Sequence, residues 1–220
     1  MANYRNNGCR GCGNLAAASY SCENTNDSRK DRCGIVGPIR AIDRECIPSA
    51  AARGSIIPFA SGAVPVALTS LIGGLVGTPF FIGFGTAVPG VILANNTINL
   101  IGLVNEAFTV PRNGTITAIS ATFTLTAALS VADEAATVTA QIYRAPAGSN
   151  TFSPTGVSVD LTPPLTSLLT VGTTLSGSAI PVAPVSVAPG DRLLMVYSLS
   201  GTSIASTVAG TASAGITIAE

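Results

Sequence analysis

The stretch Ile119-Ser-Ala-Thr-Phe-Thr-Leu125 decides how this chain folds, because apolar and polar residues alternate along it without a break. In an extended strand, successive side chains point to opposite faces of the sheet. The four apolar residues therefore share one face, and the hydroxyl residues share the other, namely Ser120, Thr122 and Thr124. This period of two predicts a half-buried antiparallel β-strand.

Other segments repeat the pattern, and turn residues separate them. Alternation recurs over residues 136–143 and 157–162. The continuous apolar run Leu193-Leu-Met-Val-Tyr197 predicts a strand buried on both faces. Pro111-Arg-Asn-Gly114 and Pro189-Gly-Asp191 lie next to such runs and favour chain reversal. Several short strands at this spacing predict an all-β fold, arranged as a two-sheet sandwich or jelly roll.

Charge divides the chain into two parts near residue 53. The whole chain has 11 basic and 11 acidic residues, and charged residues make up 10% of it, against about a quarter in a typical soluble domain. Residues 54–220, the predicted β-domain, carry three arginines and six acidic residues. So few charges predict that identical neighbours cover much of its surface.

Residues 1–53 have a different composition and are predicted to form a connector arm. This part contains all five cysteines and eight of the 11 basic residues. Its Asn- and Gly-rich start has little apolar surface to bury, so we expect an extended segment that another surface orders. Pro38 suits the first position of a short helix ending at Cys46. Ile39 and Ile42 would then share one face of this connector helix with Cys46.

The cysteines give the strongest chemical signal in the arm. An odd number of them cannot be paired completely within one chain, so a free thiol or an interchain disulfide is implied. We predict interchain disulfides and keep all five as candidates: Cys9, Cys12, Cys22, Cys33 and Cys46. The alternatives are reduced cytosolic thiols and a zinc site. Cys9-Arg-Gly-Cys12 has the spacing of half a zinc knuckle, but no second half follows.

An enzyme is not predicted, and neither is a cofactor or a metal. The chain has no histidine, which removes Ser-His and Cys-His pairs, and its single lysine, Lys30, lies in a polar charged run. That run, residues 29–32, contains three cations and one carboxylate and indicates a solvated patch, not a site for nucleic acid or an anionic surface. Residues 54–105 are uncharged, but prolines and glycines interrupt them, so no membrane span is predicted.

Several motifs in the β-domain resemble the C-terminal domain of collagen-like exosporium glycoproteins of the BclB type, found on bacterial endospores. The resemblance covers about residues 54–220 and follows the chain in order. The motifs are Gly54-Ser-Ile-Ile-Pro-Phe-Ala-Ser-Gly62, Pro65-Val-Ala-Leu-Thr69, Leu71-Ile-Gly-Gly-Leu75, Ile82-Gly-Phe-Gly85, Phe108-Thr-Val-Pro-Arg-Asn-Gly-Thr-Ile-Thr117, Val138-Thr-Ala-Gln-Ile-Tyr143 and Ala214-Gly-Ile216.

The resemblance implies a jelly roll like those of tumour necrosis factor and the complement globular heads, which form homotrimers. It also implies deposition on the spore surface, in the exosporium or coat, without a secretion signal. The chain lacks the collagen-like tract that commonly precedes this domain and has the cysteine-bearing arm instead. In this respect it looks like endospore appendage fibre subunits, in which an N-terminal connector docks into the next subunit. No particular cysteine pairing follows from that likeness.

The sequence therefore predicts a subunit of a spore-surface fibre or pilus. Its partners are copies of itself, as homotrimer and filament, and other spore-surface or anchor proteins. One alternative is a non-polymerising exosporium protein that the arm tethers to the spore. A second is a glycan- or host-binding module, which exposed aromatics would support; Tyr143 and Phe152 are the few candidates, and the alternative for both is ordinary packing.

Overall fold

A computed structural model describes residues 35–36, 39–40, 54–71, 76–93, 95–102, 105–127, 135–166, 170–201 and 206–219. The chain divides into two compact units, Met1–Ala52 and Arg53–Glu220, and each is considered by itself.

In the first unit, two short strands form an antiparallel pair. They are β1 (Ile35–Val36) and β2 (Ile39–Arg40), with Val36 opposite Ile39. The predicted helix is therefore wrong at its start, because Ile39 lies in a strand. The sequence between the two strands is Gly37-Pro38, a pair of residue types typical of turns, and β-branched residues flank it. Ile42, Lys30 and the five cysteines lie outside the described residues.

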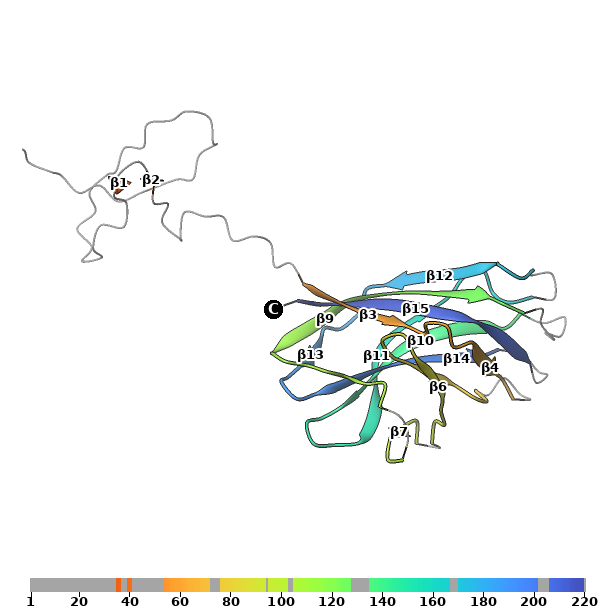
Figure 1. Ribbon diagram of the computed structural model, residues 1–220. Helices are drawn as coiled ribbons and strands as arrows, with labels where there is room; N and C mark the ends of the chain where they lie inside the picture. Colours follow the sequence, from red (N-terminus) through yellow and green to blue (C-terminus); the bar gives the residue numbers. More distant parts are fainter. Residues whose placement is uncertain are drawn as a thin grey trace, which may run out of the picture. The chain divides into compact units, whose positions relative to one another are not determined.

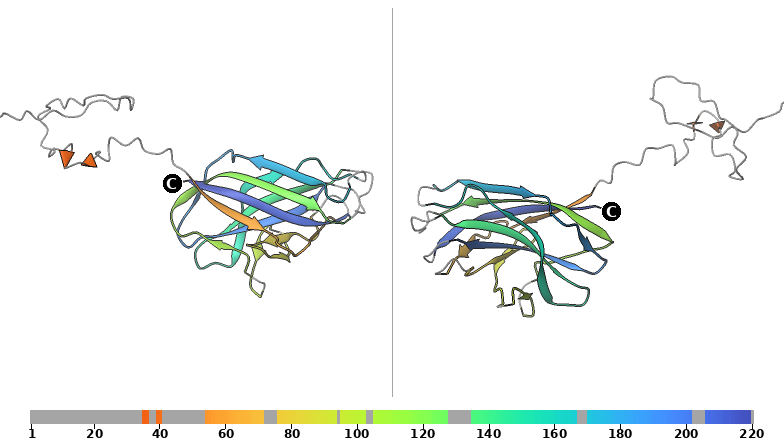
Figure 2. Two further views of the ribbon diagram at one scale, coloured as in Figure 1. Left: turned by 45° about the horizontal axis from the view of Figure 1, so that its top comes forward. Right: turned by 180° about the vertical axis from the view of Figure 1, so that it is seen from behind.

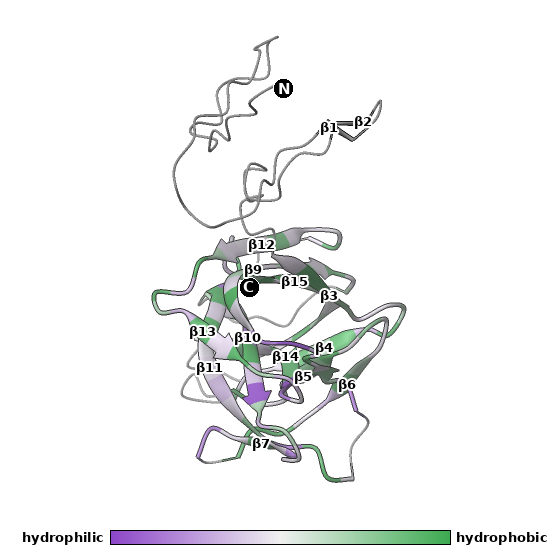
Figure 3. Cartoon of the chain, turned by 90° about the vertical axis from the view of Figure 1, so that its left-hand side faces the viewer, coloured by the Kyte–Doolittle hydropathy of each residue, from purple (hydrophilic) through white to green (hydrophobic). Residues whose placement is uncertain are grey.

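The second unit consists of two antiparallel sheets, seen end-on in Figure 3. In the first sheet the order is β12 (Thr174–Ala179), β9 (Gly114–Leu125), β15 (Thr207–Ala219), β3 (Ser55–Ala60), with β4 (Val66–Thr69) also on β15 and β13 (Val185–Val187) also on β9. In the second sheet the order is β6 (Ala87–Pro89), β5 (Phe80–Ile82), β14 (Arg192–Ser200), β10 (Thr137–Ala145), β11 (Thr151–Asp160), β7 (Ile98–Asn99), with β8 (Phe108–Thr109) also on β14.

The order of the strands is that of a jelly roll. The chain crosses between the sheets six times: from β4 to β5, β8 to β9, β9 to β10, β11 to β12, β13 to β14 and β14 to β15. Each sheet therefore holds strands from both halves of the chain, as Greek-key connections require. Figure 2 shows the two sheets from two further directions. The described residues contain no helix, and the prediction of an all-β fold is confirmed. The predicted strand over residues 119–125 is the second half of β9.

The main core lies between the two sheets and follows the predicted alternation. Ile119, Ala121, Phe123 and Leu125 of β9 are each at most 1% exposed. Tyr197 of β14 reaches across the core. Its hydroxyl donates to the backbone oxygens of two strands in the opposite sheet, at 3.1 Å in β9 and 2.7 Å in β15.

A smaller second core covers the outer face of the β14 sheet. Leu194 and Val196 of β14 pack there with Tyr143 and Phe152. The segment that carries β6 and β7, which lies below β14 in Figure 1, covers them. The alternate residues of β14 face the main core. The run 193–197 is therefore buried on both faces, as predicted from its continuous apolar composition.

Replacement of Tyr197 by Phe is expected to lower the free energy of unfolding by about 1 kcal/mol near neutral pH, because it removes the hydrogen bond that the hydroxyl shares between two backbone oxygens and keeps the ring. Burial raises the pKa of the Tyr197 hydroxyl, although its hydrogen bond to the oxygen of Thr122 partly offsets this. In the unfolded chain the Tyr197 hydroxyl ionises near pH 10. The stability that the protonated hydroxyl contributes is therefore complete below about pH 10 and is lost as the pH rises through the higher pKa of the folded state.

Urea unfolding measures both the loss of stability and its dependence on pH. The Tyr197→Phe variant and the unaltered chain are compared at about pH 8 and again above pH 10. We expect the difference between the two proteins to shrink at the higher pH. A difference that stays constant would contradict the assignment of the alkaline effect to Tyr197.

Candidate functional site

The outer face of the first sheet is lined by short hydroxyl side chains, and we call these residues the hydroxyl face. They alternate with core residues along three adjacent strands, where the period of two turns them away from the core. The members are Ser120, Thr122, Thr124, Thr174, Ser176, Ser178, Thr211 and Ser213. In Figure 1 the strands that carry them, β12, β9 and β15, form the upper layer of the sandwich.

The hydroxyls of this face pair with one another across strands. Thr122 Oγ1 lies 2.8 Å from Ser213 Oγ, and Thr124 Oγ1 lies 2.9 Å from Thr174 Oγ1. Between β12 and β9, the same two strands that Thr174 and Thr124 join, Ser178 Oγ donates to Ser120 Oγ at 2.9 Å. The face is therefore polar in composition, but much of its hydrogen-bonding capacity is already used within the sheet.

A shallow groove lies beside these hydroxyls on the same face. Its volume is about 470 Å³, and it runs across β12, β9, β15 and β3. Isoleucines that are 73% and 83% exposed, Ile56 and Ile180, stand at its two sides. The groove is lined by Ile56, Ala118, Ile119, Ser120, Ser178, Ala179, Ile180, Gly215 and Thr217, none of which is charged.

The arginines of the β-domain lie away from the hydroxyl face, near one end of the sandwich. Arg112 Nη2 donates to Ser55 Oγ at 2.7 Å, where β3 begins. Arg192 donates to the side chain of Asn150 at 2.8 Å and lies 5.2 Å from the centre of the Phe152 ring. Charge is thus placed where it fastens loops to strands, and the sheet face is left neutral.

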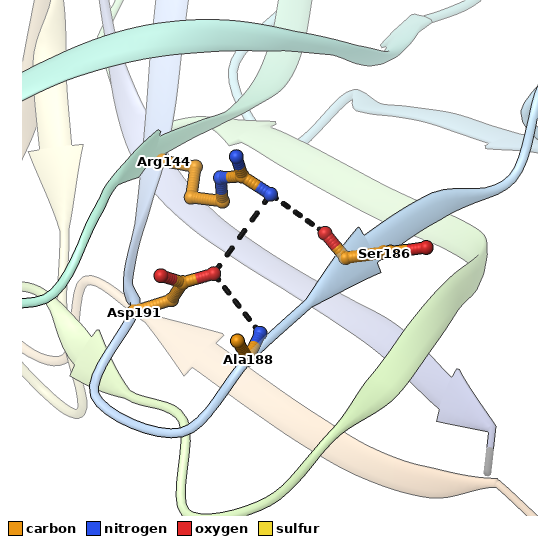
Figure 4. Close-up of polar contacts among 4 residues, drawn as sticks. All are labelled: Arg144, Ser186, Ala188 and Asp191. Atoms are coloured by element: carbon orange, nitrogen blue, oxygen red, sulfur yellow. Dashed lines mark hydrogen bonds and ion pairs between the residues drawn. The ribbon is translucent and has the colours of Figure 1, made fainter.

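Figure 4 shows the third arginine in its polar cluster. Arg144 Nη1 donates to the backbone oxygen of Ser186 at 2.6 Å and lies 3.8 Å from Asp191 Oδ2. The same carboxylate oxygen accepts the backbone N–H of Ala188 at 3.0 Å. An open cavity of about 660 Å³ adjoins the cluster. These contacts tie β10 to the turn between β13 and β14, which is a structural role.

The aromatic candidates for glycan binding are both buried. Tyr143 is 1% exposed and donates through its hydroxyl to Asn96 Oδ1 at 2.9 Å. Phe152 is fully buried in the second core. Neither ring is available to stack on a sugar, so both have the packing role that was their alternative, and neither supports glycan binding. The covering segment, which carries no simple alternation, is what buries them.

The sequence predicts that Ser120, Thr122 and Thr124 share one polar face, but it does not predict the groove beside them. The missed residues are Ile56, Ile180 and the nearby Val182. A signal did exist in Ile180-Pro-Val-Ala-Pro184, because two prolines bracket apolar residues in a segment without alternation. Such a segment is unsuited to a central strand and therefore belongs at an exposed connection.

Two negative findings concern the residues that the structure describes. Over these ranges there is no helix long and apolar enough to cross a membrane. Within the same ranges, no group of three or more Cys, Asp or Glu side chains is placed to hold a metal ion.

The chain is similar to known proteins both in sequence and in structure. No protein-family model matches the chain. The chain is 32% identical to collagen-like protein 1 of Acanthamoeba polyphaga mimivirus over 161 residues, which is 69% of this chain and 17% of that protein. The structure of Eiger TNF from S. frugiperda matches 74% of this chain and 95% of its own, at 11% identity and a TM-score of 0.31. The jelly-roll assignment rests on the strand order and not on this likeness.

Proposed function

We propose that this protein is a structural subunit of an endospore surface fibre. In this proposal the β-domains associate as homotrimers through the hydroxyl face. The arm of one layer docks onto the next layer, and interchain disulfides then cross-link them. Head-to-tail contacts of this kind do not close on themselves, so they produce filaments.

The hydroxyl face carries the proposal. Burial of a charged face in an interface is costly, whereas a neutral face whose hydroxyls already pair with one another loses few hydrogen bonds to water. The chain's own β6–β7 segment covers part of the outer face of the other sheet, over Tyr143, Phe152, Leu194 and Val196, whereas Ser120, Ser176, Ser178 and Ser213 of the hydroxyl face are exposed to a partner. The similarity to a protein named collagen-like agrees with a structural role at a surface.

Fibre formation rests on the sequence of the arm and on the resemblance to spore-surface proteins. Five cysteines within the first 46 residues supply an odd set of thiols for interchain bonds. The spore surface is the proposed location, and anchor proteins there are further proposed partners. A tethered, non-polymerising trimer is the alternative, and negative-stain images of the purified protein would distinguish discrete particles from filaments.

Electrophoresis with and without reductant tests the cross-linking. Without reductant we expect ladders or material too large to enter the gel, and with reductant a single band at the chain mass of 21.9 kDa. A single band at the chain mass without reductant, from protein purified without thiols, would contradict disulfide cross-linking. Light scattering on the reduced protein then reports the trimer separately from the disulfides.

A further inference from the structure

The connection after β12 presents one side chain almost entirely to solvent. Val182 has a relative exposure of 106%, the highest of the large apolar residues described. Pro181 and Pro184 flank it, and proline fixes the backbone angle φ. The valine is therefore held out on a stiff connection, so its burial would cost little backbone entropy. We call it the Val182 knob.

The groove on the hydroxyl face has space for such a side chain. Gly215 and Ala118 provide small residues in its lining. A Cβ built on Gly215 would meet no atom closer than 3.9 Å, so the space above that residue is open. Ile56 and Ile180 give the groove apolar sides. Both the knob and the groove are uncharged, so contact between them buries no ion.

The register of the sheet places the knob and the groove at a similar level along the strands. Ala179, three residues before the knob, is opposite Ile119 of β9, and Ile119 is opposite Ile216 of β15. The groove is lined by residues on either side of this row. The knob follows the edge strand and the groove lies on the face of the same sheet. A rotation about an axis parallel to the strands can therefore bring the edge of one copy to the face of the next.

We propose that the Val182 knob of one copy packs into the groove over Gly215 of a second copy. This contact, repeated between the subunits, would close the homotrimer. The contact is heterologous, because a knob meets a groove and not another knob, and repetition around a closed rotation gives a cyclic oligomer. This inference rests on the proposed function, to which it adds the residues on each side of the interface.

Photo-cross-linking in the full-length chain tests the contact directly. A diazirine-bearing residue takes the place of Val182, and ¹⁴N- and ¹⁵N-labelled chains are mixed so that mass spectrometry separates interchain from intrachain products. We expect interchain cross-links to peptides containing Ala118–Ser120 or Gly215–Thr217. The same residue at Val171, which is 57% exposed in the loop before β12, is the control and should not label those peptides.

Substitutions test the same contact through affinity. Val182→Asp and Gly215→Val should each weaken association of the reduced protein at least 10-fold, measured by analytical ultracentrifugation, whereas Val171→Asp should leave it within 2-fold. Val182 has no packing to lose, so its variant keeps the fold. An associated protein that cross-links elsewhere, or that tolerates Val182→Asp, overturns this contact and leaves the proposed function standing. A reduced chain that stays monomeric at all concentrations overturns both.

Discussion

Replacement of Ser213 by Asp should convert the associated protein into monomers, with affinity reduced about 100-fold or more. Ser213 lies in β15, beside Thr122 of the neighbouring strand, within the hydroxyl face. In a trimer, the substitution would place carboxylates in a neutral, desolvated interface with no cation nearby. An unpaired buried charge costs several kcal/mol, and each 1.4 kcal/mol is a factor of ten in affinity.

Sedimentation velocity of the reduced protein over a range of concentrations measures this effect. Ser158→Asp is the matched control, because Ser158 is also an exposed serine within a strand, but lies on β11 of the other sheet. We expect the control to associate as the unaltered chain does. Equal loss of association in both variants would point to net charge, and no loss in either would remove the hydroxyl face from the interface.

Truncation of Phe123 to Ala should cost about 3–5 kcal/mol of the free energy of unfolding, the largest effect expected from a single core substitution here. The ring is completely buried between the sheets, 6.4 Å from the Tyr197 ring. Gly210 lies against it so closely that a Cβ there would come within 2.6 Å of the ring. Backbone on that side of the ring cannot easily collapse into the space left by the truncation.

Urea unfolding at one fixed protein concentration measures this loss, since association would otherwise shift the midpoint. Phe84→Ala is the control, because Phe84 is 57% exposed, although its ring stacks on that of Phe59 with the ring centres 5.5 Å apart. We expect the control to lose about 1 kcal/mol or less. Similar losses in the two variants would mean that the core between the sheets is not packed as described.

Four strands of the main core, β9, β10, β11 and β14, could be predicted at least in part because each one carries its own signal. Alternation in β9, and the continuous run in β14, reflect which faces are buried, and a period of two needs no knowledge of the neighbours. The β6–β7 segment has no such period. Its role depends on the side chains that it covers, among them Tyr143 and Phe152, and no local pattern shows that it covers them.

Only the part of the candidate interface that lies on a single strand could be predicted, because alternation is a local signal. The sequence places three hydroxyl residues of β9 on one face, but their partners on β12 and β15 lie 50 to 91 residues away along the chain. Only the register between strands brings those side chains together, and no local pattern determines it. The prediction that Ile39 lies in a helix was wrong for a local reason, because Pro38 suits both the start of a helix and a turn.

The way β3 joins the domain bears on how it would respond to tension. Ser55, at the start of β3, is opposite Ile218, near the end of β15, so chain attached at either strand end leaves from the same end of the ladder. Force applied between these points would open the hydrogen bonds one after another instead of shearing them together. Pro58 lacks an N–H to add to the six-residue strand. In a fibre loaded through residue 54 in this way, β3 would peel away first and lengthen the chain while the rest of the sandwich stays folded.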